Sequence, residues 1–289
     1  MSTSSENPTT SPFDDPSADV ILRSSDGIEF PTFTTLLSLA SPVFRDMEGV
    51  SRAGADVKKE GIPVVEMDED GRVLKLLLRF CYPKRKPVIK TFEDAKSLLI
   101  AAKKYDMEFI VEASKERLLK EGKDDPIALY AFACAHKLRD LARDAAIMAL
   151  RKTENELLPP DSPPLIAEFH DISAWSFMQL LYYHRKCVSA LSSLDIEQAA
   201  KPSIPRCASC SPGNSVYSSL WSPFTNRLRV ALMVRPHGDV VQYAARVMRS
   251  QCPHCSSSES VSNDISTCIK KLTNHINTVV AKVPLELGF

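Results

Sequence analysis

The sequence has little of what marks an enzyme. Only nine glycines occur in 289 residues, and they are too scattered to form a loop that cradles phosphates. There is no G-x-S-x-G motif and no H-E-x-x-H motif. Four histidines lie in helical patterns without a paired nucleophile or metal-ligand spacing, and they are His136, His170, His184 and His275. We therefore expect a protein that is not an enzyme.

Long apolar runs are also missing. No run approaches the length of a membrane span, so we expect no membrane partner. The first residues, MSTSSENPTTSPFDDPS, contain no apolar core of the signal-peptide kind. Nothing directs the chain out of the cell, and we expect it in the cytoplasm, the nucleus or both. Its eight cysteines should then be reduced, bound to metal or buried.

The chain has no net charge, but the charge is unevenly distributed. Residues 201–289 carry ten Lys and Arg against four Asp and Glu. This basic region could bind nucleic acid, or it could balance the negative charge of metal-bound thiolates. We favour the second explanation, which leaves nucleic acid as the less favoured partner.

What is present indicates a globular protein that begins with a small α/β unit. The composition is 44% hydrophobic and 25% charged, and the length suggests two domains, perhaps with an appendage. Residues 1–17 are rich in Ser, Thr, Pro and Asp and predict a disordered leader. Two short apolar runs around Ser25-Asp26-Gly27 predict a hairpin that ends at Pro31. Helical spacing follows over 33–47, with Ser41-Pro42 as a break or as the start of a second short helix.

The rest of this first region alternates one more strand with helices. Residues 50–60 are polar and predict a loop, and 62–67 predict a strand whose Pro63 suggests an edge position. Residues 72–81 predict a buried helix, and Thr91-Phe-Glu-Asp94 has the spacing of a capping box that begins the next one. A further helix is expected over 109–119.

The order of these elements and two of their sequence motifs resemble those of a known family. The phrases S-L-A-S-P-V-F-R-D-M and L-L-R-F-C-Y-P, after a hairpin that begins at Asp19-Val20, are similar to those of BTB/POZ domains. The resemblance is closest to fungal proteins of basidiomycete type and covers residues 18–121. The family's usual histidine in the first long helix is Phe33 here, a change at a mostly structural position. The resemblance implies a BTB/POZ-like α/β fold in this region.

The remaining chain predicts only helices. Residues 124–198 resemble, in position, the BACK segment that follows BTB in adaptor proteins. They begin with the cap Asp125-Pro126 and include a long helix over 173–194. Residues 201–289 predict a C-terminal helical unit, whose last helix carries an apolar stripe expected in the core: Ile265, Ile269, Leu272, Ile276, Val279 and Val283. No internal repeat is found. The predicted fold class is therefore α+β.

Two C-x-x-C pairs carry the strongest chemical signal. A two-residue gap lets both sulfurs of a pair reach one tetrahedral ion. We therefore expect a structural Zn²⁺ held by Cys207, Cys210, Cys252 and Cys255. The gap between the pairs exceeds that of compact zinc ribbons, so four reduced cysteines without metal remain an alternative. A redox role for Cys252-Pro-His-Cys255 lacks the strand before it and the helix after it that lower a thiol pKa. Cys81 and Cys134 are expected in the core, whereas Cys187 or Cys268 could substitute as ligands.

The family resemblance implies the function. BTB domains typically self-associate, so we expect a homodimer, and many recruit a cullin-type ubiquitin ligase. The predicted function is thus a protein-interaction adaptor. By the same resemblance, the first strand and first long helix are the candidate dimer face, formed by Asp19, Val20, Ile21, Leu22, Leu36, Leu37, Ala40 and Val43. The alternative hypothesis is a transcriptional regulator whose basic C-terminal unit binds nucleic acid.

Overall fold

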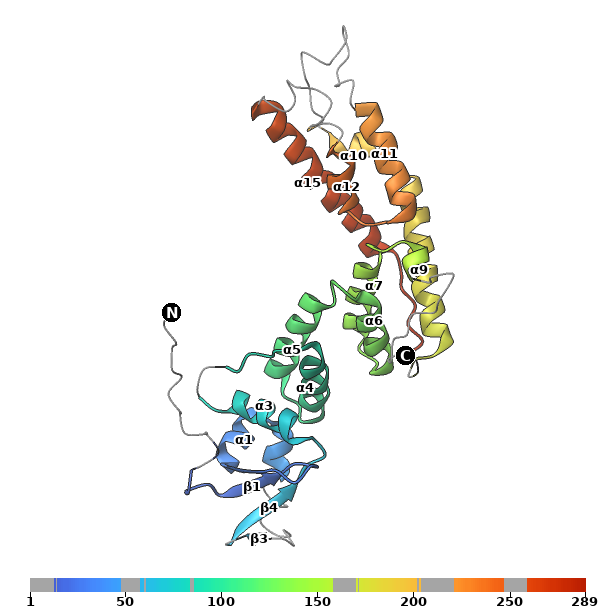
Figure 1. The fold of residues 1–289 in the computed structure, drawn as a ribbon. Coiled ribbons are helices and arrows are strands. Elements are labelled where there is room, and N and C mark those ends of the chain that lie inside the picture. Colours follow the sequence, from blue (N-terminus) through green and yellow to red (C-terminus); the bar gives the residue numbers. More distant parts are fainter. Residues whose placement is uncertain are drawn as a thin grey trace, which may run out of the picture. The chain divides into compact units, whose positions relative to one another are not determined.

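A computed structural model shows two compact units, residues 1–121 and residues 122–289, called unit 1 and unit 2 below. The structure describes residues 13, 15–47, 58–59, 61–83, 86–157, 170, 172–201, 203, 221–246 and 259–289. Figure 1 shows the described elements coloured along the chain. Each unit has its own core and is described separately.

Unit 1 contains a mixed sheet in the order β2-β1-β4-β3. Strand β1 (Val20–Arg23) pairs antiparallel with β2 (Glu29–Thr32), which confirms the predicted hairpin. The strand continues one residue past Pro31, because a proline is tolerated on an outer strand. On its other side β1 pairs parallel with β4 (Ile62–Glu66). The first strand is therefore an inner strand of the sheet.

The predicted edge position of the third strand is wrong, and residues 58–59 of the predicted loop form a strand. Strand β4 lies inside the sheet, because a two-residue strand β3 (Lys58–Lys59), in the stretch predicted as loop, pairs with it. Pro63 itself pairs only with β3, at Lys58, whereas the ladder to β1 begins at Val64. The proline is thus tolerated because the two ladders lie on successive parts of the strand.

The helices of unit 1 lie on one side of its sheet in Figure 1. They are α1 (Thr34–Ala40), a helical segment over 42–47, α3 (Gly71–Cys81), α4 (Phe92–Lys104) and α5 (Glu108–Glu121). The break at Ser41 and the helix over 72–81 are confirmed. Side-chain caps fix two starts, because Asp70 Oδ1 accepts from Val73 N–H and Thr91 Oγ1 accepts from Asp94 N–H. The Asp94 carboxylate itself accepts from Arg72.

One residue assigned to the leader belongs to the core of unit 1. Phe13 is buried, with its ring edge-on to Phe30 and to Tyr82 at centroid distances of 5.3 and 5.6 Å. A single aromatic residue inside a polar segment does not change the average composition, so this contact could not be predicted from composition.

Among its described residues, unit 2 contains helices and no strand. Its helices are α6 (Pro126–Ala135), α7 (Arg139–Ala149), α8 (Glu154–Leu157), α9 (Ala174–Ser192), α10 (Ile196–Ala200), α11 (Trp221–Val234), α12 (Val240–Ala244) and α15 (Glu259–Lys282). The first two form a hairpin, and α9 packs against both α11 and α15. The cap at Asp125-Pro126 is confirmed by a bond from Ala128 N–H to Asp125.

The core of unit 2 joins its two predicted parts. The stripe on α15 is buried at Ile265, Leu272, Ile276 and Val283 and half-buried at Ile269 and Val279, so its core role is confirmed. Helix α10, from the segment before residue 201, packs on α15. Both predicted parts lie in one compact unit. The division of this region at residue 201 stays a prediction.

Candidate functional site

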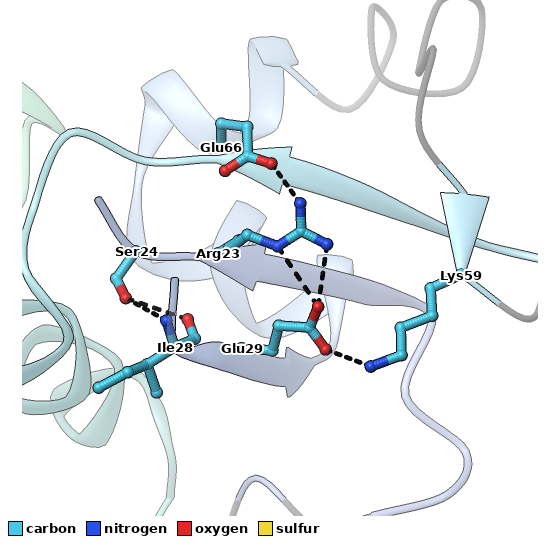
Figure 2. Close-up of polar contacts among 6 residues, drawn as sticks. All are labelled: Arg23, Ser24, Ile28, Glu29, Lys59 and Glu66. Carbon is cyan, nitrogen blue, oxygen red and sulfur yellow. Dashed lines mark hydrogen bonds and ion pairs between the residues drawn. The ribbon is translucent and has the colours of Figure 1, made fainter. Parts of the chain in front are cut away.

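The sheet of unit 1 presents a network of ion pairs (Figure 2). Arg23 on the central strand contacts Glu29 on β2 at 2.9 Å and Glu66 on β4 at 2.7 Å, and Lys59 on β3 reaches Glu29 at 2.6 Å. Lys59 and Arg23 lower the pKa of the Glu29 carboxyl through these bonds. Each pair is partly exposed and so contributes little stability alone. The network links all four strands with balanced charge.

The candidate dimer residues on β1 are inside the unit. Val20, Ile21 and Leu22 are buried, and their strand is paired on both sides. Both Asp19 carboxylate oxygens accept bonds from Thr34 at 2.7 Å, one from its backbone N–H and one from its hydroxyl. Asp19 thereby fixes the start of α1 against the strand. Val20, Ile21 and Leu22 are therefore core residues, whereas Asp19 is exposed, and the part of these four residues in a dimer remains a prediction.

The candidates on the first helix lie nearer the surface. Leu36, Ala40 and Val43 are half-buried, whereas Leu37 is buried. Between them Leu39 is 82% exposed, the largest exposed fraction among the exposed large hydrophobic residues of the described chain. Sequence reasoning missed it because it falls outside the apolar stripe of its helix. An isolated Leu on the polar side of an amphipathic helix was the available signal.

The predicted zinc ligands Cys207, Cys210, Cys252 and Cys255 lie outside the described residues. Within the described part of the chain, no group of three or more His, Cys, Asp or Glu side chains could hold a metal ion. The cysteines described there are free thiols, and they are Cys81, Cys134, Cys187 and Cys268.

Burial makes these free thiols poor nucleophiles. It raises the pKa of Cys81 to about 12 and the pKa of Cys134, Cys187 and Cys268 to about 11. Three of them are buried and Cys81 is half-buried. Because the thiolate is the reactive form, these four side chains are suited to packing rather than to chemistry.

The comparisons agree with the fold of unit 1. Residues 13–121 match the BTB/POZ domain family, and this match begins at the buried Phe13. A BTB/POZ domain is generally a protein-interaction module, and its family is not an enzyme family. No curated protein matches the chain. Among the described helices, none has both the length and the apolar character needed to cross a membrane.

Proposed function

We propose that this chain is a protein-interaction adaptor that self-associates through its BTB/POZ domain. The observation that carries the proposal is Leu39, an apolar side chain 82% exposed on α1, within the domain matched at residues 13–121. Three half-buried candidates, Leu36, Ala40 and Val43, lie near it in sequence. Burial of such a group against a second copy would remove apolar area from water.

Light scattering of the full chain tests this proposal. We expect a dimer at tens of micromolar, roughly where a weak homodimer with a micromolar constant forms. Leu39→Glu should shift the chain to monomer while its circular dichroism spectrum stays that of the wild type, because the side chain is exposed. Val88→Glu is the matched control, since Val88 is also exposed, at 70%, in the same unit but outside the candidate face. A monomeric wild type, or equal effects of both variants on the oligomeric state, would contradict the proposal.

The finer assignments of this domain rest on sequence. From the resemblance of its sequence motifs, we propose that the domain is of the fungal type and that it recruits a cullin-type ubiquitin ligase. Co-purification of a cullin with the full chain, compared with the Leu39→Glu variant, tests that partner. Nucleic-acid binding by the basic C-terminal region is the competing hypothesis. A duplex DNA titration across a salt series tests it, because phosphate contacts weaken steeply with salt.

We also propose that Cys207, Cys210, Cys252 and Cys255 hold one structural Zn²⁺. Four thiolates in two C-x-x-C pairs match the ligand set that zinc prefers, and they leave no open position for catalysis. The contact of α10 with α15 supports the idea, because these helices precede the first pair and follow the second. Elemental analysis should find about one zinc per chain, bound as in other four-cysteine sites. Loss of zinc in Cys207→Ser, but not in Cys187→Ser, is the expected pattern.

A further inference from the structure

A furrow runs along α11 in unit 2. Its widest part has a volume of about 550 Å³, and a second part of about 280 Å³ shares Thr153 and Val234 with it. A third, of about 40 Å³, shares Val188 and Met233 with the second. Because neighbouring hollows share lining residues, they form one continuous surface, the α11 furrow. It is bordered by α8, α9 and α12.

The lining of the furrow is largely apolar. Val234 and Val240 contribute to its widest part, and Met233 links the two narrower parts. Met233 is 61% exposed and Val234 is 46% exposed. Exposed apolar side chains that gather in a hollow, rather than singly on a convex surface, are typical of binding sites. This lining is suited to apolar side chains of another molecule.

The charged groups of the furrow have an excess of arginine. Its lining includes four arginines and two carboxylates, which are Arg151, Arg185, Arg229, Arg235, Asp239 and Glu154. Three pairs join them to acids: Arg151 to Asp239 at 3.0 Å, Arg235 to Glu156 at 3.4 Å, and Arg185 to Glu154. These pairs are about half-exposed, so each is weak and can exchange for a better partner.

Further positive charge lies at the wide end, around Tyr243. The Arg227 guanidinium lies 4.7 Å from the centre of that ring and donates to its hydroxyl at 3.0 Å, and Arg246 lies 5.8 Å from the ring. The bond from Arg227 lowers the pKa of the Tyr243 hydroxyl. The wide end therefore favours negative charge, next to an apolar floor.

The turn between α11 and α12 is held in place. Gly238 N–H donates to Asn277 Oδ1 at 3.1 Å, and its carbonyl accepts from the Thr273 hydroxyl at 3.3 Å. His237 is buried, and its Nδ1 accepts from Asp239 N–H at 3.2 Å. One wall of the furrow is therefore fixed before any ligand arrives, which lowers the entropy lost on binding.

We propose that the α11 furrow binds an acidic, amphipathic peptide segment of a partner protein. Its apolar residues would pack on Met233 and Val234, and its carboxylates would pair with Arg235 and Arg151. A nucleic acid fits less well, because the apolar floor at Met233 and Val234 offers a phosphate backbone little to contact. The site lies in unit 2, so it does not depend on self-association through unit 1.

Fluorescence anisotropy with the full chain tests this proposal. The probe is a fluorescein-labelled helical peptide of Leu and Glu, about 14 residues long, which is enough for an amphipathic helix to present successive anchors. We expect saturable binding that weakens between about 50 and about 300 mM NaCl. Met233→Asp and Arg235→Glu should each weaken binding about tenfold or more, as for central interface residues. The same peptide with Lys in place of Glu should not bind.

Matched controls separate the furrow from general effects. Val230→Asp changes a side chain on the same helix, 64% exposed and outside the lining, and Lys270→Glu reverses an exposed charge on α15. Both should leave binding within about twofold of wild type. Three outcomes overturn the proposal. One is no binding at about 100 µM peptide, which excludes useful affinity. The second is that the chain binds duplex DNA and that Arg235→Glu abolishes this binding whereas Met233→Asp does not. The third is that Met233→Asp abolishes self-association.

Discussion

At the residue scale, the buried thiols have a testable consequence. With a pKa raised to about 11, Cys134, Cys187 and Cys268 carry almost no thiolate at pH 8 and are closed to solvent. A thiol reagent at that pH should therefore modify them, and Cys81, only after unfolding. If the two C-x-x-C pairs bind zinc, a chelator should expose four further thiols in the folded chain. Fast reaction of more than four thiols in a chelated sample with an unchanged circular dichroism spectrum would contradict this expectation.

His184 makes the stability of unit 2 depend on pH. Burial lowers its pKa, although Glu154 and the bond from Nε2 to the Lys152 carbonyl act in the opposite direction, and Arg185 adds to the lowering. Below about 6.5 the unfolded chain binds a proton that the folded ring resists, so stability falls with pH from there toward the folded pKa.

Urea unfolding at about pH 7.5 and about pH 5.5 measures this linkage. His184→Gln should reduce the loss of stability between the two pH values. The buried His237, whose pKa is also lowered by burial, would account for what remains. His275→Gln is the control, because His275 is exposed and should leave the pH dependence as in wild type. An unchanged pH dependence in His184→Gln would reject the assignment.

At the element scale, the turn that joins α11 to α12 has no room for a side chain. A Cβ at Gly238 would lie 2.6 Å from Asn277 Oδ1 and 2.9 Å from Thr273 atoms, one of them backbone. Gly238→Ala should therefore destabilise the chain by about 1 to 3 kcal/mol, the usual cost of overpacking. Chemical denaturation checks this value. Gln242→Ala, on the exposed side of α12, should change stability by less than about 0.5 kcal/mol.

A smaller loss in Gly238→Ala than in Gln242→Ala would show that the turn can move away from α15. Gly238→Ala should also weaken binding of the Leu and Glu peptide, because the turn carries one wall of the α11 furrow. This links the packing of one glycine to the proposed binding site.

At the scale of the whole molecule, the two compact units should fold independently. Each has its own buried core, represented by Leu74 and Leu98 in unit 1 and by Leu228 and Leu272 in unit 2. We expect residues 1–121 and residues 122–289, produced separately, each to unfold cooperatively at the temperature of the matching transition in the full chain. Calorimetry of the fragments and of the intact chain checks this. A fragment 122–289 without a cooperative transition would show that unit 2 needs the first.

The sequence by itself determined the elements that depend on near neighbours. Thr91 and Asp125 cap their helices through bonds to an N–H three residues later, so a short motif was enough to place each start. The stripe on α15 was also predictable, because helical spacing places its residues on one face whatever they pack against. The sequence motifs of the family also located the BTB/POZ domain, because each motif lies within a short segment of the chain.

Tertiary structure alone decided the features that join distant residues. The ladder between β3 and β4 placed Pro63 inside a sheet, and Phe13 found its partners at Phe30 and Tyr82. The α11 furrow brings Arg151 within 3.0 Å of Asp239 and places Val188 beside Met233. No local pattern encodes such pairs, because their members are distant in the chain and meet only in the step of loop closure and packing. Which apolar side chains stay exposed, as Leu39 does, is decided at that same step.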